Sequence, residues 1–172
     1  TDLKKAKATR DCSDCDLSSA FLSRADLNGA NLRKAKLSDA NLSGTYLIGA
    51  YLSYANLSDA NLSDANLDGA ILRGANLSDA NLGGAILRGA NLGDANLRDA
   101  DLRDADLRDV DLRYANLSDA NLSSANLTQV KNLSINKLSK VKTLYKAKLD
   151  PELIEQVREK YPHLLEGPKL EE

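Results

Sequence analysis

The dominant feature of the chain is a leucine that returns every five residues, without a change of phase, from Leu17 to Leu127. Most of these 23 units have Ala two positions before the Leu and Asn or Asp directly before it. An α-helix turns about 100° per residue, so leucines five apart would scatter around its surface. A straight strand would send them to alternate faces. The period therefore predicts a chain that bends once per unit and returns each Leu to one interior.

The two residues after each Leu have the chemistry of a turn, as in Ser38 and Asp39 or Gly83 and Gly84. Glycine supplies positive φ, and Asp or Ser hydrogen-bonds to the nearby backbone. Short strands joined by such bends can stack through backbone hydrogen bonds, with coils about 4.8 Å apart. The sequence therefore predicts a solenoid with a core of Leu and Ala.

This repeat resembles the pentapeptide-repeat family, whose motif is Ala-(Asp/Asn)-Leu followed by two variable residues. The resemblance covers residues 15–130 and departs from the motif at Cys15, Thr45, Val110 and Val130, which stand in place of the Ala. It implies an all-β solenoid, a right-handed quadrilateral β-helix with four units per coil and nearly six coils. In that fold the Leu and the preceding Ala point inward.

Both ends of such a solenoid expose strand edges that invite aggregation, so capping segments are expected. We predict an N-terminal cap, helical or irregular, over residues 1–14 and a C-terminal helical cap over residues 131–165. In the second cap, Asp150 and Pro151 are typical of a helix start, and Pro162 ends that helix. A shorter helix is expected near residues 134–140, with a fragment of coil around Ala147 between the two helices. Residues 166–172 are predicted to be a tail, disordered from Gly167 onward.

Composition limits the classes of function. The chain has 172 residues, the size of one domain, with 23 Lys plus Arg and 25 Asp plus Glu. The net charge of −2 argues against a general nucleic-acid binder, which would be basic. No apolar run is long enough to cross a membrane, so membrane insertion is not expected. No signal peptide is recognised, although a chain that begins at Thr1 instead of Met is compatible with a removed leader.

Cys12 and Cys15 form a CxxC pair with three competing interpretations. We favour a structural disulfide that clamps the N-terminal cap, which would indicate an oxidising compartment. The second interpretation is a reduced, inert pair. The third is a redox-active pair or a metal site, but the sole His163 is distant in sequence and the usual four zinc ligands are missing. No catalytic residue, cofactor or metal is therefore expected.

Stacking at 20-residue intervals predicts columns of identical side chains on the surface. An acidic column could bind a cation or present an acidic stripe to a partner, but a solvated turn position is the simpler interpretation. A ring of Arg at 98, 103, 108 and 113, interleaved with Asp at 99, 104 and 109, is interpreted as a solubilising belt of weak ion pairs. The acidic column consists of Asp39, Asp59, Asp79, Asp99 and Asp119.

Several apolar residues occupy positions that should face solvent. Tyr51 and Ile71 are predicted to stack directly on one face, while Tyr46 and Ile86 share the neighbouring face two coils apart. Clustered exposed apolar groups often mark partner sites, although scattered tolerance of apolar residues on a β surface is the alternative. The predicted patch consists of Tyr46, Ile48, Tyr51, Tyr54, Ile71 and Ile86.

These features favour a non-catalytic structural or interaction protein with flat faces, an unknown protein partner and a monomeric state. The family resemblance suggests a first alternative, an acidic DNA mimic that binds DNA gyrase. Residues 15–130 hold 15 Asp against 10 Lys plus Arg, and a supercoiling assay would test this alternative. A thiol-redox protein acting through Cys12 and Cys15 is the second alternative. Similar members are abundant in cyanobacteria and chloroplasts, which implies the periplasm or thylakoid lumen if the disulfide forms, and the cytoplasm otherwise.

Overall fold

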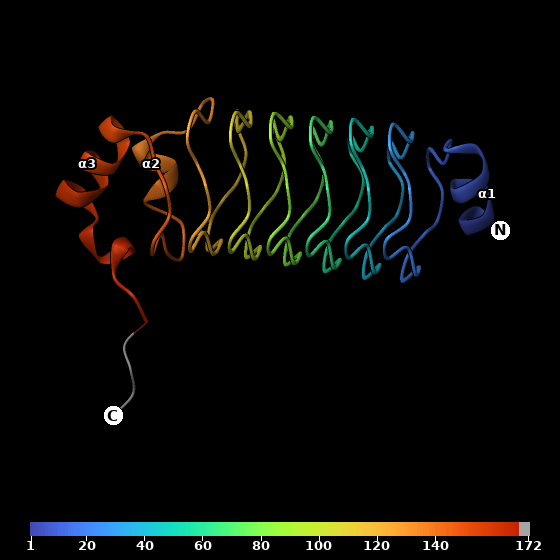
Figure 1. Ribbon diagram of the computed structural model, residues 1–172, viewed down its shortest axis with the longest axis horizontal. Helices are drawn as coiled ribbons and strands as arrows, with labels where there is room; N and C mark the ends of the chain where they lie inside the picture. The colour runs from blue at the N-terminus through green and yellow to red at the C-terminus, as the bar shows by residue number, and fades with distance from the viewer. Residues whose placement is uncertain (169–172) are drawn as a thin grey trace.

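The computed structural model describes residues 1–168 and shows a rod of stacked coils with helices at both ends (Figure 1). Residues that directly precede the leucines form parallel bridges with residues 20 positions later, from Asp11 with Asn31 to Asp111 with Lys131. Each coil therefore holds four five-residue units, as the repeat predicted. Residues 169–172, which belong to the predicted tail, lie outside the described residues.

The bridges form four ladders, one on each side of the rod. We number these sides faces 1, 2, 3 and 4 by ladders that begin at Asp16, Phe21, Asp26 and Asp11 and advance 20 residues per step. Residues one position after each Leu lie on the same face. Residues two positions after it lie at the edge between that face and the next.

Hydrogen bonds explain the choice of residues in each bend. The Asn61 side-chain oxygen accepts the N–H of Ser63 at 3.0 Å, and the N–H of Ala65 donates to the carbonyl of Leu62 at 3.0 Å. The residue at each edge has positive φ, for example 57° at Asp59 and 64° at Gly69. Asn or Asp before the Leu and Gly, Asp or Ser after it therefore satisfy the backbone of the turn locally.

The interior is a close-packed column of leucine and alanine, with Leu72 and Ala75 typical in being 0% and 1% exposed. Thr45 is the buried polar exception among the described residues, and its hydroxyl donates to the carbonyl of Leu22 at 2.7 Å. Where Val110 replaces Ala, its N–H lies 3.3 Å from the Leu107 carbonyl, compared with 2.9 Å between Ala90 and Leu87. The longer contact indicates that the additional methyl groups crowd the bend.

The N-terminal end is closed by helix α1, Asp2–Thr9, which buries Ala6 against the first coil. The Asp2 carboxylate accepts the N–H of Asp16 at 2.7 Å. The predicted cap boundary at residue 14 is wrong, because regular bridges begin at Asp11. Cys12 takes the place of a core Leu, so the repeat extends four residues further toward the N-terminus than the leucines alone indicate.

The C-terminal end interrupts the coil before it is capped. After Lys131 the chain forms the short helix α2, Ile135–Leu138, and then returns to the ladders at Thr143 and Lys148. Helix α3, Pro151–Lys160, and the 3₁₀ helix η1, Pro162–Leu165, follow. The predicted helical cap over residues 131–165 therefore contains two further bridges of the solenoid. Among the described residues, no helix has the length and apolarity needed to span a bilayer.

Asp150 has the predicted position at the start of α3 but not the predicted hydrogen bond. Its side chain does not cap α3. Instead, both carboxylate oxygens accept the N–H of Gln129 at 3.1 Å. This contact ties the last full coil of the rod to the beginning of α3.

Candidate interaction surfaces

Cys12 and Cys15 form a disulfide, with their Cα atoms 5.1 Å apart. Both side chains lie in the core of the first coil, 0% and 5% exposed, and helix α1 packs against this end of the rod. The backbone of Cys12 also belongs to the regular coil, since its N–H donates to the carbonyl of Asn31 at 2.8 Å. Thiol exchange requires access of an attacking thiolate to a sulfur atom. The burial of this disulfide therefore favours a structural role.

Removing the disulfide should loosen the first coil. A closed loop this short contributes about 2 kcal/mol in the chain-entropy model. We expect the double variant Cys12→Ala/Cys15→Ala to lose about 1–2 kcal/mol of stability in urea unfolding. Hydrogen exchange at Leu17 should accelerate while exchange at Leu97 stays unchanged. Equal acceleration at both amides, or none at Leu17, would contradict a local clamp.

The acidic column lies at the edge between faces 1 and 2, where each of its five Asp residues is exposed and has positive φ. Arg98 lies 3.1 Å from the carboxylate of Asp99 and 3.9 Å from that of Asp119. Within residues 1–168, no group of three or more His, Cys, Asp or Glu is arranged to hold a metal ion. The geometry fits solvated turn positions.

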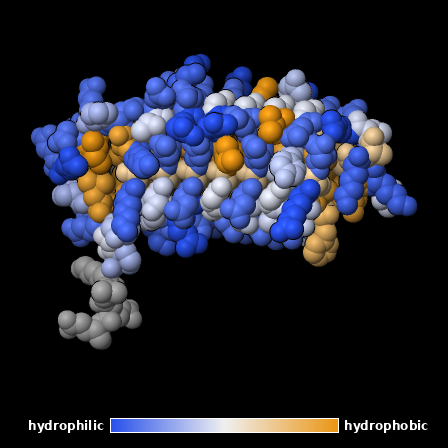
Figure 2. Space-filling view, viewed as in Figure 1, coloured by the Kyte–Doolittle hydropathy of each residue, from blue (hydrophilic) through white to orange (hydrophobic). Residues whose placement is uncertain are grey.

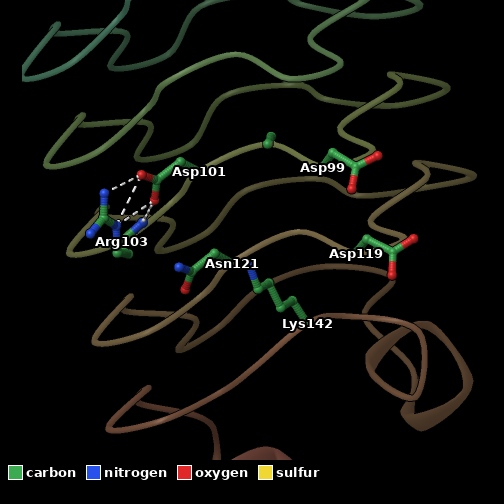
Figure 3. Close-up of a pocket in the computed structure, with 7 residues that line it drawn as sticks. Asp99, Asp101, Arg103, Asp119, Asn121 and Lys142 are labelled. Atoms are coloured by element: carbon green, nitrogen blue, oxygen red, sulfur yellow. Dashed lines mark hydrogen bonds and ion pairs between the residues drawn. The ribbon is translucent and has the colours of Figure 1, made fainter. Parts of the chain in front are cut away.

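A depression of about 590 Å³ opens beside the end of this column (Figure 3). Asp99 and Asp119 border it on one side, and Asp101 and Arg103 on the other. Arg103 donates to both carboxylate oxygens of Asp101, with its Nη2 2.5 Å from Oδ2. Because Asp101 is already paired, its charge is largely neutralised, and the depression offers a mixed polar surface.

The arginine ring pairs differently from the prediction. Only Arg98 binds an interleaved carboxylate, that of Asp99. Arg103 and Arg108 bind carboxylates two residues earlier on their own faces, because side chains at positions before and after a Leu point outward from the same short strand. Arg113 follows the same pattern more loosely, 3.9 Å from Asp111.

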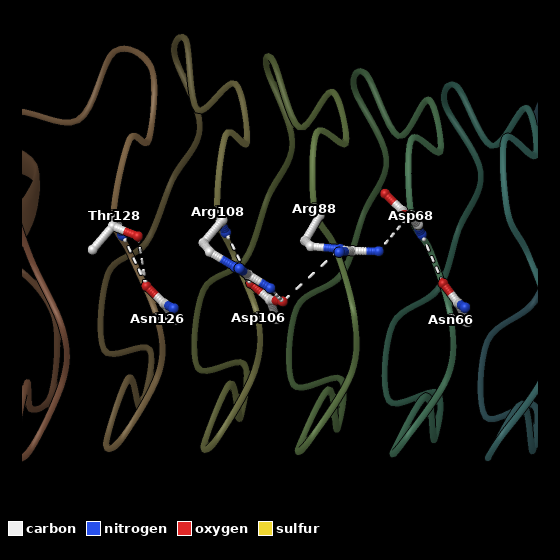
Figure 4. A network of polar contacts seen from close by, with 7 residues as sticks. All are labelled: Asn66, Asp68, Arg88, Asp106, Arg108, Asn126 and Thr128. Atoms are coloured by element: carbon white, nitrogen blue, oxygen red, sulfur yellow. Dashed lines mark hydrogen bonds and ion pairs between the residues drawn. The ribbon is translucent and has the colours of Figure 1, made fainter.

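Face 3 carries the most extended network of charges (Figure 4). Arg88 donates to the Asp68 carboxylate at 2.7 Å and approaches Asp106 at 4.0 Å, while Arg108 lies 2.5 Å from Asp106. The network therefore crosses from the coil of Asp68 to that of Arg108. The side-chain hydrogen bond from Arg108 is the main cause that holds the pKa of Asp106 below its ordinary value.

Asp106→Asn should reduce stability in a pH-dependent way. Because the pKa of Asp106 is lowered in the folded protein, the pairing stabilises the fold above the unfolded pKa of about 4 and is lost as the pH falls through the folded pKa. We expect the variant to lose about 0.5–1 kcal/mol at pH 7. The difference from the unmodified protein should vanish near pH 2 in thermal unfolding measured across pH. A difference that is constant with pH would exclude the ion pair as its cause.

The structure confirms the predicted stacking of the apolar residues. Tyr51 and Ile71 are direct neighbours on face 4, and Tyr46 and Ile86 flank Asn66 on face 3. Tyr46 and Ile48 are 50% and 44% exposed. These residues surround the edge between faces 3 and 4, so two apolar groups from different ladders lie on either side of it.

Glycines keep this edge bare. Gly49 and Gly69 have positive φ, and a Cβ atom at either would meet nothing within 4 Å. Asp, Ser and Lys adopt the same conformation at other edges, for example Asp59 and Lys34. The conformation therefore does not require glycine here. Its effect is to leave no side chain between the apolar residues of face 3 and those of face 4.

Tyr54 is separated from this edge. It lies at the opposite edge of face 4, where its ring covers Gly74 so closely that a Cβ there would stand 2.5 Å from a ring carbon. Arg33 stacks over the ring of Tyr51 at 4.4 Å, which adds a cation beside the apolar group. The patch supported by the structure thus consists of Tyr46, Ile48, Tyr51, Ile71 and Ile86.

Two further aromatic residues are more exposed than any residue of the patch. Phe21 is 77% exposed on the first rung of face 2, and Tyr114 is 78% exposed at the edge between faces 4 and 1. Tyr114 was missed by the sequence analysis, although an aromatic residue at a turn position of the repeat was a usable signal. Figure 2 shows a mostly hydrophilic face with separate apolar spots along the rod and a larger group at the end that carries α2 and α3.

The pentapeptide-repeat family model matches the chain in eight copies, over residues 11–47, 40–79, 50–89, 75–113 and 90–129. The chain is similar to the structure of HetL, a pentapeptide repeat protein involved in heterocyst differentiation regulation from the cyanobacterium Nostoc sp. strain PCC 7120. The identity is 32%, the TM-score 0.52, and the match covers 80% of this chain and 71% of HetL.

Two other solved pentapeptide repeat proteins are similar at lower TM-scores. Rfr23 from the cyanobacterium Cyanothece 51142 is 27% identical with a TM-score of 0.39, over 87% of this chain and 97% of Rfr23. A protein from the Arabidopsis thaliana thylakoid lumen is 28% identical with a TM-score of 0.34, over 74% of this chain and 70% of that protein. No curated protein matches the chain.

Proposed function

The chain belongs to the pentapeptide-repeat family, and from this premise we propose that it is a non-catalytic docking rod that binds a partner protein through the apolar patch of faces 3 and 4. The family also supports the right-handed, four-sided winding of the rod. The observation that carries the proposal is the continuity of the patch across a bare glycine edge, with Tyr46 and Ile48 on one side and Tyr51 and Ile71 on the other.

The chemistry of the patch suits a protein interface. Tyrosine and arginine are enriched among residues that dominate binding energy, and here Arg33 stacks on Tyr51 beside two exposed aliphatic side chains. The backbone beneath the patch is held by hydrogen bonds to both neighbouring coils, such as the N–H of Ile71 to Ala50 and that of Leu52 to Ile71. A partner would therefore meet a preformed surface, which lowers the entropic cost of binding.

Affinity capture from the native organism tests the proposal. The bait is the full chain, compared with the variant Tyr51→Asp/Ile71→Asp. The matched control, Asn56→Asp/Asn76→Asp, changes the same ladder position to the same residue on face 1. We expect a protein that is captured by the unmodified chain and the control but reduced at least tenfold with the patch variant. An unchanged catch would refute the patch, provided that circular dichroism shows both variants folded.

The relatives and the disulfide extend the proposal to role and compartment. HetL is described as involved in the regulation of a differentiation process, and regulation through binding is a role that a preformed docking surface can serve. The disulfide between Cys12 and Cys15 supports an oxidising compartment such as a periplasm or thylakoid lumen.

The two alternative functions have weaker support. A gyrase-binding DNA mimic requires an acidic surface, but Asp101 and Asp106 are each paired with arginine on faces 2 and 3. The absence of any effect on gyrase supercoiling at micromolar protein would reject it. A thiol-redox function requires accessible sulfur, and the cysteines are buried in the first coil. The absence of disulfide-exchange activity in the unmodified protein would reject that alternative.

A further inference from the structure

Face 1 ends at its C-terminal side in a strand edge with unused hydrogen-bonding groups. Within the rod, the residue before each Leu pairs with the preceding coil: Asn116 donates its N–H to Ala95 at 2.9 Å and accepts the N–H of Leu97 at 2.8 Å. The corresponding groups one coil later are the carbonyl of Ala115 and the N–H of Leu117. Among the described residues neither has a backbone or side-chain hydrogen-bond partner.

The open edge follows from the path of the chain after the last repeat. Lys131 continues the ladder of face 4, Thr143 that of face 2 and Lys148 that of face 3. The residues that would continue face 1 lie instead in helix α2 and the turn after it. The chain therefore skips one of the four faces in its final coil, and α2 lies at that end of the rod (Figure 1).

A groove of about 220 Å³ separates this edge from α2. Its walls are the strand from Tyr114 to Leu117 on one side and Asn136, Lys137 and Lys140 on the other. Ala115 and Leu117 are 6% and 4% exposed, whereas their counterparts one coil earlier, at 95 and 97, are 1% and 0% exposed. Solvent therefore reaches the strand edge through the groove.

The charge of the groove selects the guest. Residues 131–148 contain six Lys and no Asp or Glu. Lys140 is exposed and has no ion-pair partner within residues 1–168, while the Lys137 ammonium donates to the carbonyls of Leu112 and Asn132. A second depression, of about 410 Å³, adjoins Tyr114 and Lys137 and is bordered by Arg113. Cations thus lie on both sides of the exposed Tyr114 ring.

We propose that this groove binds an extended acidic segment of another protein, which adds a seventh rung to face 1 by strand addition. One guest residue makes both backbone bonds: its N–H donates to the carbonyl of Ala115, and its carbonyl accepts the N–H of Leu117. The guest strand runs parallel to residues 114–117, as every rung of the ladder does. Main-chain bonds of this kind provide affinity, and contacts of the carboxylates with Lys140 and Arg113 provide selectivity.

Hydrogen exchange on the full chain tests the edge and its guest together. The probe is the synthetic peptide acetyl-Asp-Glu-Ala-Asp-Leu-Glu-Asp-amide. In the free protein we expect the N–H of Leu117 to exchange at least 100-fold faster than that of Leu97. Saturating peptide should slow exchange at Leu117 at least tenfold and leave Leu97 unchanged. The same peptide with an N-methyl group on the central Asp, or with Lys in place of every acid, should give no protection.

Matched protein variants separate a specific groove from general attraction to lysines. Lys140→Glu should weaken binding of the probe at least tenfold. Lys146→Glu makes the same charge change at an exposed turn residue between faces 2 and 3 and should leave binding within twofold. The docking variant Tyr51→Asp/Ile71→Asp, which is remote from this end, should also bind the probe normally. The two proposals can therefore fail separately.

Three results would overturn the inference. If Leu117 is already as protected as Leu97 in the free chain, the edge is covered within the molecule and no guest strand is needed. If the acidic probe gives no protection, or the Lys-substituted peptide protects equally, the guest has other chemistry. If Lys140→Glu and Lys146→Glu weaken binding equally, the attraction comes from net charge and the groove has no part in it.

Discussion

Replacing Leu72 with Ala is expected to lower the free energy of unfolding by about 3–4 kcal/mol, the largest effect we expect for a single truncation in the rod. Leu72 is fully buried and lies in the column between Leu52 and Leu92. The backbone cannot collapse into the cavity, because the N–H of Leu72 is fixed to Asn91 and that of Leu52 to Ile71. The cost therefore includes both the lost burial and an unfilled cavity.

Equilibrium unfolding in urea measures this effect. The control is Ile71→Ala, one residue earlier in the same strand, where the half-buried side chain points away from the core. We expect that variant to lose less than about 1 kcal/mol, since most of its side chain leaves one aqueous surface for another. A Leu72→Ala variant as stable as Ile71→Ala would show that the leucine column does not hold the rod together.

Replacing Ala75 with Leu is expected to destabilise the rod by about 2–3 kcal/mol through overpacking. Ala75 is 1% exposed at the inward site that precedes a Leu by two positions. Its N–H donates to the Leu72 carbonyl at 3.0 Å, and this short bend leaves no space for a larger side chain. The longer contact at Val110, 3.3 Å, already shows the direction of the effect for two additional methyl groups.

Thermal unfolding of a small set of variants tests the overpacking argument. Asn76→Leu introduces the same side chain at the next, outward position and should change stability by less than about 1 kcal/mol. Val110→Ala should cost less than an ordinary loss of buried methyl groups, because it relieves crowding while it removes contacts. If Ala75→Leu proves neutral, the interior has unfilled space and the account of Val110 is wrong as well.

The sequence predicted the parts of the molecule that depend only on the five-residue period. Stacking of Tyr51 on Ile71 follows from counting 20 residues, so the patch could be drawn before the coordinates. The arginine partners could not be predicted in this way. Arg103 reaches either Asp101 or Asp104 along the sequence, and only the outward direction of both side chains on face 2 selects Asp101.

Features that break the period were less accessible. Cys12 was not recognised as the equivalent of a core Leu, because cysteine does not belong to the repeat motif, so the first rung at Asp11 was missed. The open edge at Leu117 was missed for a different reason. It depends on where the chain leaves the coil after Lys131 and which face it then skips, and no residue in the edge itself differs from the repeat.

The offset of 20 residues between paired rungs also governs how genes of this kind can change length. Duplicating or deleting 20 codons preserves every column, because each remaining side chain keeps its neighbours above and below. Losing five codons leaves the leucine interior equally well filled but rotates everything downstream by a quarter turn. Such a change upstream of Ile71 would move that residue away from Tyr51. Mutational events of the two sizes would therefore preserve folding alike, yet only the larger one would preserve a composite surface.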